Sequence, residues 1–80
     1  MKNINLLSQN GDLLVNYRNV LRLFVTELGD SGRWDIRVEY PGGGQNVLAR
    51  FNSQRECETA FTNAASLIAN ETRLISFRDL

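Results

Sequence analysis

The stretch WDIRVEYPGGGQNVLARF, residues 34–51, contains two strand-like runs on either side of a glycine-rich turn. Apolar and polar residues alternate without a break in the first run, which is typical of a strand with one buried face. The apolar members of this run are Trp34, Ile36, Val38 and Tyr40. In the second run, Val47, Ala49 and Phe51 are expected to face the same core. The stretch therefore predicts a β-hairpin with strands over about residues 33–40 and 46–51.

The turn of this hairpin combines the only proline of the chain, Pro41, with three consecutive glycines. A phosphate-binding loop of the P-loop kind joins a strand to a helix and ends in lysine followed by serine or threonine. Here Gln45 and a second strand follow, so the glycines are interpreted as a turn. Proline at the second position and Gly42 at the third favour a type II turn that begins at Tyr40.

Three further strands are predicted before this hairpin, over about residues 3–9, 12–17 and 20–28. Asn10 and Gly11 separate the first two and favour a type I′ turn, in which both residues have positive φ. The GDSG sequence that follows the third strand predicts another turn. The residues expected to face the core are Ile4 and Leu6 in the first strand, Val15 and Tyr17 in the second, and Leu21, Leu23 and Val25 in the third.

One helix is predicted over about residues 54–69, because Ser53 and Glu56 before it have capping-box spacing. Apolar residues then recur at three- and four-residue steps, as on an amphipathic helix: Cys57, Ala60, Phe61, Ala64, Leu67 and Ile68. Residues 72–80 predict a short strand or an ordered arm. The expected fold is α+β, with an antiparallel sheet of four to five strands and the C-terminal helix packed on one face.

The alternation also predicts which side chains lie on the sheet face away from the helix. Inward residues must meet across each hairpin, so Val25 is expected opposite Ile36, and Tyr40 opposite Val47. The open face then carries a row of Phe24, Arg37 and Arg50, surrounded by Arg22, Asp35 and Glu39, with Leu14 and Leu48 nearby.

This open face has three interpretations. Asp35 and Glu39 can neutralise the arginines in a ladder of charges. Phe24 and the arginines can instead stack a base and hold a phosphate of a nucleic acid. The apolar members can also form a contact with another protein, which aromatic residues and arginine favour. The candidate partner-binding residues are Phe24, Arg22, Arg37, Leu48 and Arg50.

Few residues of the chain suit catalysis. Histidine is absent, which removes the usual general base near neutral pH and the usual transition-metal ligand. Asp35 and Glu39 flank Arg37, which lowers carboxylate pKa values instead of raising one for acid catalysis. Cys57, the only cysteine, falls on the apolar helix stripe and is interpreted as a core residue. We expect no enzyme activity, no cofactor and no metal site.

The composition restricts the class of protein further. Eighty residues are enough for one domain, and nine basic residues balance nine acidic ones. This balance argues against a general nucleic-acid coat or a membrane-surface binder. No stretch approaches the roughly 18 apolar residues of a membrane span, so a cytoplasmic protein is expected. Because such a small core is marginal, self-association as a homodimer is expected as well.

Two segments carry a resemblance to families of very short bacterial and phage proteins. LLSQNGDLLVNYRNVLRL, residues 6–23, and FNSQRECETAF, residues 51–61, give a strand and helix order that resembles the FlbD-like group of small flagellar and regulatory proteins. The second segment also resembles the sheet-to-helix junction of some small phage-encoded anti-CRISPR proteins. Both resemblances imply a small, non-enzymatic, protein-binding module, and no functional residue carries over from either.

The expected function is therefore that of a protein-binding or oligomerisation module with a regulatory or inhibitory role, in a bacterial or phage setting. The expected partner is another protein, with a second copy of the chain as a further partner. The interface is expected on the open sheet face or on an edge strand, with the C-terminal arm as a possible addition. The alternative is a nucleic-acid-binding protein that uses the arginine and aromatic residues of the open face.

Overall fold

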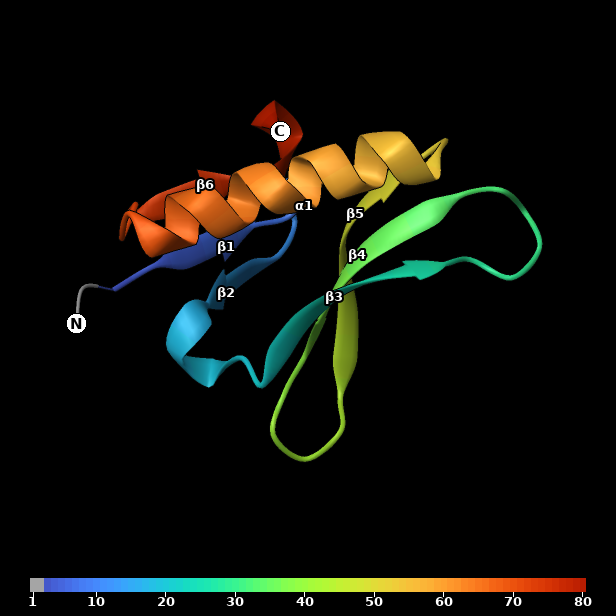
Figure 1. Cartoon of the computed structure of the whole chain (residues 1–80). Coiled ribbons are helices and arrows are strands. Elements are labelled where there is room, and N and C mark those ends of the chain that lie inside the picture. The colour runs from blue at the N-terminus through green and yellow to red at the C-terminus, as the bar shows by residue number, and fades with distance from the viewer. Residues whose placement is uncertain (1–2) are drawn as a thin grey trace.

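The computed structural model describes residues 3–80 and contains two three-stranded sheets beneath one α-helix (Figure 1). The elements are β1 (Asn5–Leu7), β2 (Leu14–Asn16), β3 (Arg22–Glu27), β4 (Trp34–Glu39), β5 (Gln45–Phe51), α1 (Gln54–Ala69) and β6 (Leu74–Ser76), with short 3-10 helices η1 (Tyr17–Asn19) and η2 (Phe77–Asp79). The α+β class with one helix is confirmed. The prediction of one antiparallel sheet with four to five strands is met only in part, because the strands form two sheets of three strands each.

The first sheet has the order β2-β1-β6. β1 and β2 are antiparallel with Leu6 opposite Val15, so the predicted pairing of their inward faces is confirmed. β6 adds to the other edge of β1 in parallel, with Ile75 beside Leu6. Ile75 and Phe77 are fully buried, so the predicted C-terminal arm is part of the core. The chain between β1 and β6 includes the second sheet and α1, and this long crossover makes the parallel pairing possible.

The turn between β1 and β2 differs from the predicted type I′ turn. Gly11 has a φ of 76°, but Asn10 does not have positive φ. The Gly11 N–H donates to the Ser8 carbonyl over 2.9 Å, and the Ser8 hydroxyl donates to Asp12 over 2.9 Å. Ser8 is buried, and its side chain also accepts a hydrogen bond from the Leu13 N–H. These side-chain hydrogen bonds stabilise a wider turn without changing the register of the strands.

The second sheet has the order β3-β4-β5. The β3–β4 register is the predicted one, with Val25 opposite Ile36 and Phe24 opposite Arg37. The predicted β4–β5 register is wrong. The structure pairs Ile36 with Ala49 and Arg37 with Val47, where the prediction set Ile36 against Phe51, Arg37 beside Arg50 and Tyr40 against Val47.

The β4–β5 register changes at a bulge, where Leu48 is the extra residue of β5. Leu48 turns into the core and is 1% exposed, whereas Val47 is 36% exposed on the other face. The predicted directions of both side chains are therefore wrong. The β1–β2 turn contacts the bulge, because the Gln9 N–H donates to the Leu48 carbonyl over 2.7 Å and the Gln9 side-chain oxygen accepts from the Arg50 N–H over 3.0 Å.

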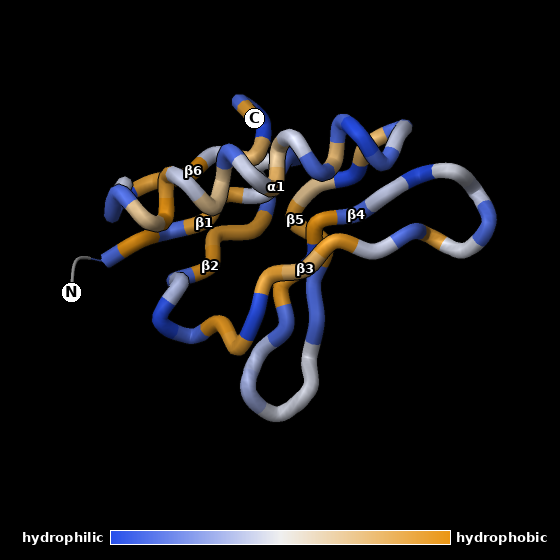
Figure 2. The backbone as a smooth tube through the Cα atoms, in the orientation of Figure 1, coloured by the Kyte–Doolittle hydropathy of each residue, from blue (hydrophilic) through white to orange (hydrophobic). Residues whose placement is uncertain are grey.

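The glycine-rich turn matches its prediction. The Gly43 N–H donates to the Tyr40 carbonyl over 3.0 Å, and Gly42 has a φ of 104° at the third position. Residues 41–45 are all exposed, and Figure 2 shows that this turn is neutral to hydrophilic. The loop therefore closes a hairpin and lines none of the core.

α1 lies across both sheets and covers their apolar sides (Figures 1 and 2). The predicted stripe is confirmed, since Cys57, Ala60 and Ala64 are buried and Phe61, Leu67 and Ile68 pack against the core. The Ser53 side chain accepts from the Glu56 N–H over 3.2 Å, as expected for an N-cap. No helix within residues 3–80 has the length and apolar character needed to cross a membrane.

Leu21, like Val47, was predicted to face the core and lies outside it. Leu21 precedes β3 and is 61% exposed, so its predicted inward position is wrong. Its N–H donates to the Glu39 carbonyl over 2.8 Å, at the point where the chain leaves η1 and enters the sheet. The inward alternation therefore begins at Leu23, because regular strand pairing begins only at Arg22.

Candidate partner-binding surfaces

The open face of the second sheet contains four of the five candidate partner-binding residues. Pairing across the strands gives a row of Phe24, Arg37 and Val47, and a second row of Thr26, Asp35 and Arg50. The predicted neighbour of Arg37 was Arg50, but the bulge separates their backbones into different rows. Leu48, the fifth candidate, is buried in the core and does not reach this face.

Asp35 is at the centre of the open face and is 0% exposed. Arg37 Nη2 lies 2.9 Å from Asp35 Oδ2, and Arg50 Nε lies 2.7 Å from Asp35 Oδ1. Burial alone would raise the pKa of Asp35, but hydrogen bonds and positive charge from Arg50 and Arg37 outweigh it, so the net pKa is lowered. The same contact raises the pKa of Arg50. We call these three residues the Asp35 cluster.

Arg22 occupies the edge of the same face and is paired as well. It forms an ion pair with Glu39, and its guanidinium carbon lies 4.3 Å from the centre of the Phe24 ring. Each arginine that the sequence placed on this face thus has a carboxylate partner. The geometry has the form of a charge ladder, and it leaves these guanidinium groups already engaged.

The predicted apolar surplus of the open face is small in the structure. Leu14 is 60% exposed but belongs to β2 in the other sheet, and Leu48 is in the core. Phe24 is half-buried, so Val47 is the other apolar side chain that the registers place here. The open face is therefore mainly polar and offers little apolar contact surface.

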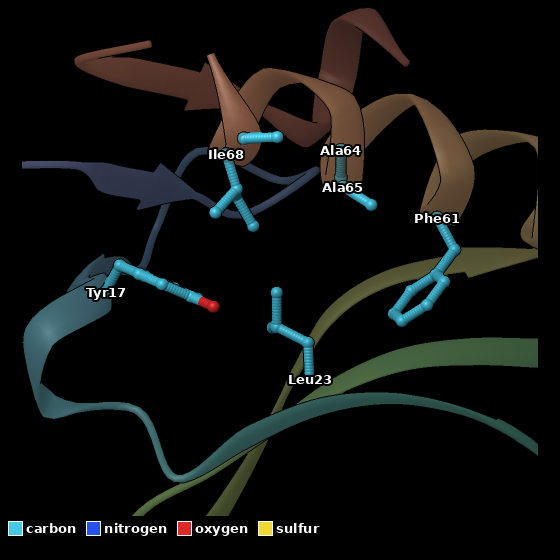
Figure 3. Close-up of a pocket in the computed structure, with 7 residues that line it drawn as sticks. Tyr17, Leu23, Phe61, Ala64, Ala65 and Ile68 are labelled. Carbon is cyan, nitrogen blue, oxygen red and sulfur yellow. The ribbon is translucent and has the colours of Figure 1, made fainter. Parts of the chain in front are cut away.

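An apolar pocket of about 300 Å³ lies between α1, β3 and η1 (Figure 3). Its lining residues carry no charge: Tyr17, Leu23, Phe61, Ala64, Ala65, Ile68 and Ala69. Figure 3 shows side chains from the helix and Tyr17 surrounding Leu23. We call this site the α1–β3 pocket. The sequence pattern assigned several of these residues to the core, and most of them are only partly buried in the structure.

Cys57, the one cysteine of the chain, is not among the residues that line this pocket. Burial, with smaller contributions from Asp35 and Glu58, raises the pKa of the Cys57 thiol to about 11. Cys57 is 0% exposed, so its interpretation as a core residue is confirmed. Within residues 3–80, no group of three histidine, cysteine, aspartate or glutamate side chains is placed to hold a metal ion.

Comparisons with known protein families, with characterised proteins and with solved structures find no match to this chain.

Proposed function

We propose that this protein is a small non-enzymatic module of the cytoplasm that acts by binding another protein. The α1–β3 pocket carries this proposal. Its lining is uncharged and mostly apolar, so it can bury an apolar group of a partner, and the Tyr17 hydroxyl is the one ionisable group among its lining residues. Its volume of about 300 Å³ is at the lower end of small-molecule sites and suits one large side chain of a protein.

One exposed leucine near the start of β3 is consistent with a protein partner. Leu21 is 61% exposed just before β3, the strand that contributes Leu23 to the pocket. A protein that fills the pocket can also cover this side chain, which a ligand confined to the pocket does not.

Site-specific photo-crosslinking tests this proposal. A benzophenone amino acid at Ala65, which lines the pocket, should crosslink to one defined protein in the native host. The same group at Thr62, an exposed helix residue that does not line this pocket, should give no such product. A protein that gives no specific product at Ala65 and is strictly monomeric at high concentration would contradict the proposal.

The proposal includes a homodimer, because a domain of this size gains stability by self-association. Light scattering over a range of concentrations should then give twice the chain mass of 9.1 kDa. Binding to labelled single-stranded DNA or RNA provides the competing test. Binding that weakens steeply with salt and is lost in Arg37→Glu would favour a nucleic-acid function instead.

A further inference from the structure

Among residues 3–80, β3 is an edge strand whose outer side pairs with no other strand. The Leu28 N–H donates to the Arg33 carbonyl over 2.9 Å, which fixes the alternation of hydrogen bonds between β3 and β4. In this register Phe24 and Thr26 bond toward β4, so the backbone groups of Leu23 and Val25 point outward. Those outward groups make no hydrogen bond to another described part of the chain. They form a template for one more strand.

The free edge and the α1–β3 pocket adjoin at Leu23. The backbone of Leu23 lies on the open edge of β3, while its side chain lines the pocket beneath α1. A strand added at this edge would therefore run beside the pocket and place every second side chain toward it. A groove between an edge strand and a helix is one of the recurring ways in which a domain binds an extended peptide.

Charge at the end of β3 adds to the specificity of this groove. Glu27 is exposed and has the same alternation as Leu23 and Val25, so it belongs to the same side of the strand. It takes part in none of the ion pairs among the described residues. A basic residue at the matching position of an added strand would form a favourable cross-strand pair with Glu27.

We propose that an extended peptide segment of a partner protein adds as a strand to the outer edge of β3, places one large apolar side chain in the α1–β3 pocket, and presents a basic residue to Glu27. This inference rests on the proposed protein-binding function and specifies the form that the partner takes. The backbone of β3 supplies affinity for any extended chain, whereas the pocket and Glu27 select among sequences.

A library of short peptides with one position randomised at a time is the probe for this proposal. We expect strong selection for leucine, isoleucine or phenylalanine at one position and for lysine or arginine at another. In an added strand, every second backbone N–H group of the peptide points toward β3. N-methylation of the best peptide at these residues should weaken binding about tenfold, and N-methylation at the residues between them should weaken it much less. That alternation is characteristic of strand addition and would be absent if the peptide bound as a helix.

Matched variants locate the binding site on the protein. Ala65→Trp narrows the pocket from an exposed helix position and should weaken peptide binding at least about tenfold. Ser66→Trp places the same side chain one residue further on, outside the pocket, and should bind as the wild type does. Glu27→Lys should reverse the charge preference of the library. Circular dichroism should show that all three variants fold.

Several results would overturn the inference. The library could show no selection, or Ala65→Trp could bind the best peptide as tightly as the wild type does. The peptide could shift backbone NMR signals only at the Asp35 cluster. Finally, β3 could pair with a second copy of the chain. The broader proposal is tested separately. A partner protein could crosslink at Ala65 while Glu27→Lys leaves its binding unchanged and N-methylation of the best peptide has no alternating effect. That combination would retain the protein-binding function and reject strand addition.

Discussion

The two faces of β4 are built from alternate residues of one six-residue strand, yet different forces stabilise them. Ile36 and Asp35 are neighbours in the chain, and both are 0% exposed. Ile36 belongs to the apolar core beneath α1, where burial is favourable in itself. Asp35 is buried on the face without a helix, where Arg37 and Arg50 bind its carboxylate. A charged group can thus be covered by its own neighbours in the sheet, provided that they also pair with it.

The largest effect is expected for thiol reactivity on the helix-covered face. Cys57 lies in the same core as Ile36. At pH 8 the native protein should react with an aromatic disulfide reagent at least about a thousandfold more slowly than the urea-unfolded chain. Burial and a thiol pKa of about 11 both reduce the reaction. The control Ser66→Cys adds an exposed thiol on the same helix and should show one fast equivalent. Fast reaction of the wild-type thiol would mean that the helix-covered face is open.

The bulge in β5 provides a matched pair of substitutions. Leu48→Ala should lower the free energy of unfolding by about 3 kcal/mol, because it empties a core position. Val47→Ala, at the adjacent residue on the open face, should cost less than about 1 kcal/mol. Urea denaturation at one protein concentration measures both values. Equal costs, or a larger cost at Val47, would contradict the exchange of faces that the bulge produces.

Asp35→Asn tests the opposite face. It should lower the free energy of unfolding at pH 7 by about 2 kcal/mol, below the usual cost for a buried pair because both arginines also reach water. The lowered pKa of Asp35 means that its contribution is complete above the unfolded-state value of about 3.9 and is lost as the pH falls through the folded-state value.

The difference between wild type and Asp35→Asn should therefore shrink in acid. Asp30→Asn, in the exposed turn between β3 and β4, is the matched control and should change little at any pH. Denaturation curves at several pH values give both comparisons. A difference that stays constant down to the lowest pH would show that the cost comes from placing an amide N–H2 against the arginine donors and not from losing the carboxylate charge.

The smallest effect is expected at the edge of the open face. Arg22 is 57% exposed in its side chain, so the Glu39 ion pair and the Phe24 contact are both well solvated. Arg22→Ala should lower the free energy of unfolding by less than about 1 kcal/mol, and less again in high salt. Arg33→Ala, at an exposed residue without an ion pair among the described residues, provides the baseline. A cost as large as that of Asp35→Asn would mean that the edge and the centre of this face act as one network.

The sequence predicted the helix, the β3–β4 register and the glycine turn because each depends on neighbouring residues. The apolar stripe from Cys57 to Ile68 was enough to predict the helix, and the alternation from Trp34 to Val38 was enough to predict the register of β4 with β3. It predicted the charge pairing on the open face in part, since Asp35 and Arg37 share one strand face by alternation alone. The contact of Asp35 with Arg50 depends on the register of β5, which the bulge altered.

The sequence by itself determined the α+β class, the strand and helix segments, and the absence of histidine chemistry, because composition and periodicity are properties of the chain. Only the tertiary structure decided the division into two sheets, the turn of Leu48 into the core and the formation of the α1–β3 pocket. Each of these depends on segments that are distant in the sequence. β6 pairs with β1, Gln9 bonds to β5, and Phe61 and Leu23 line one pocket. Local patterns do not encode such contacts, because many partners can satisfy the same exposed edge or apolar side chain.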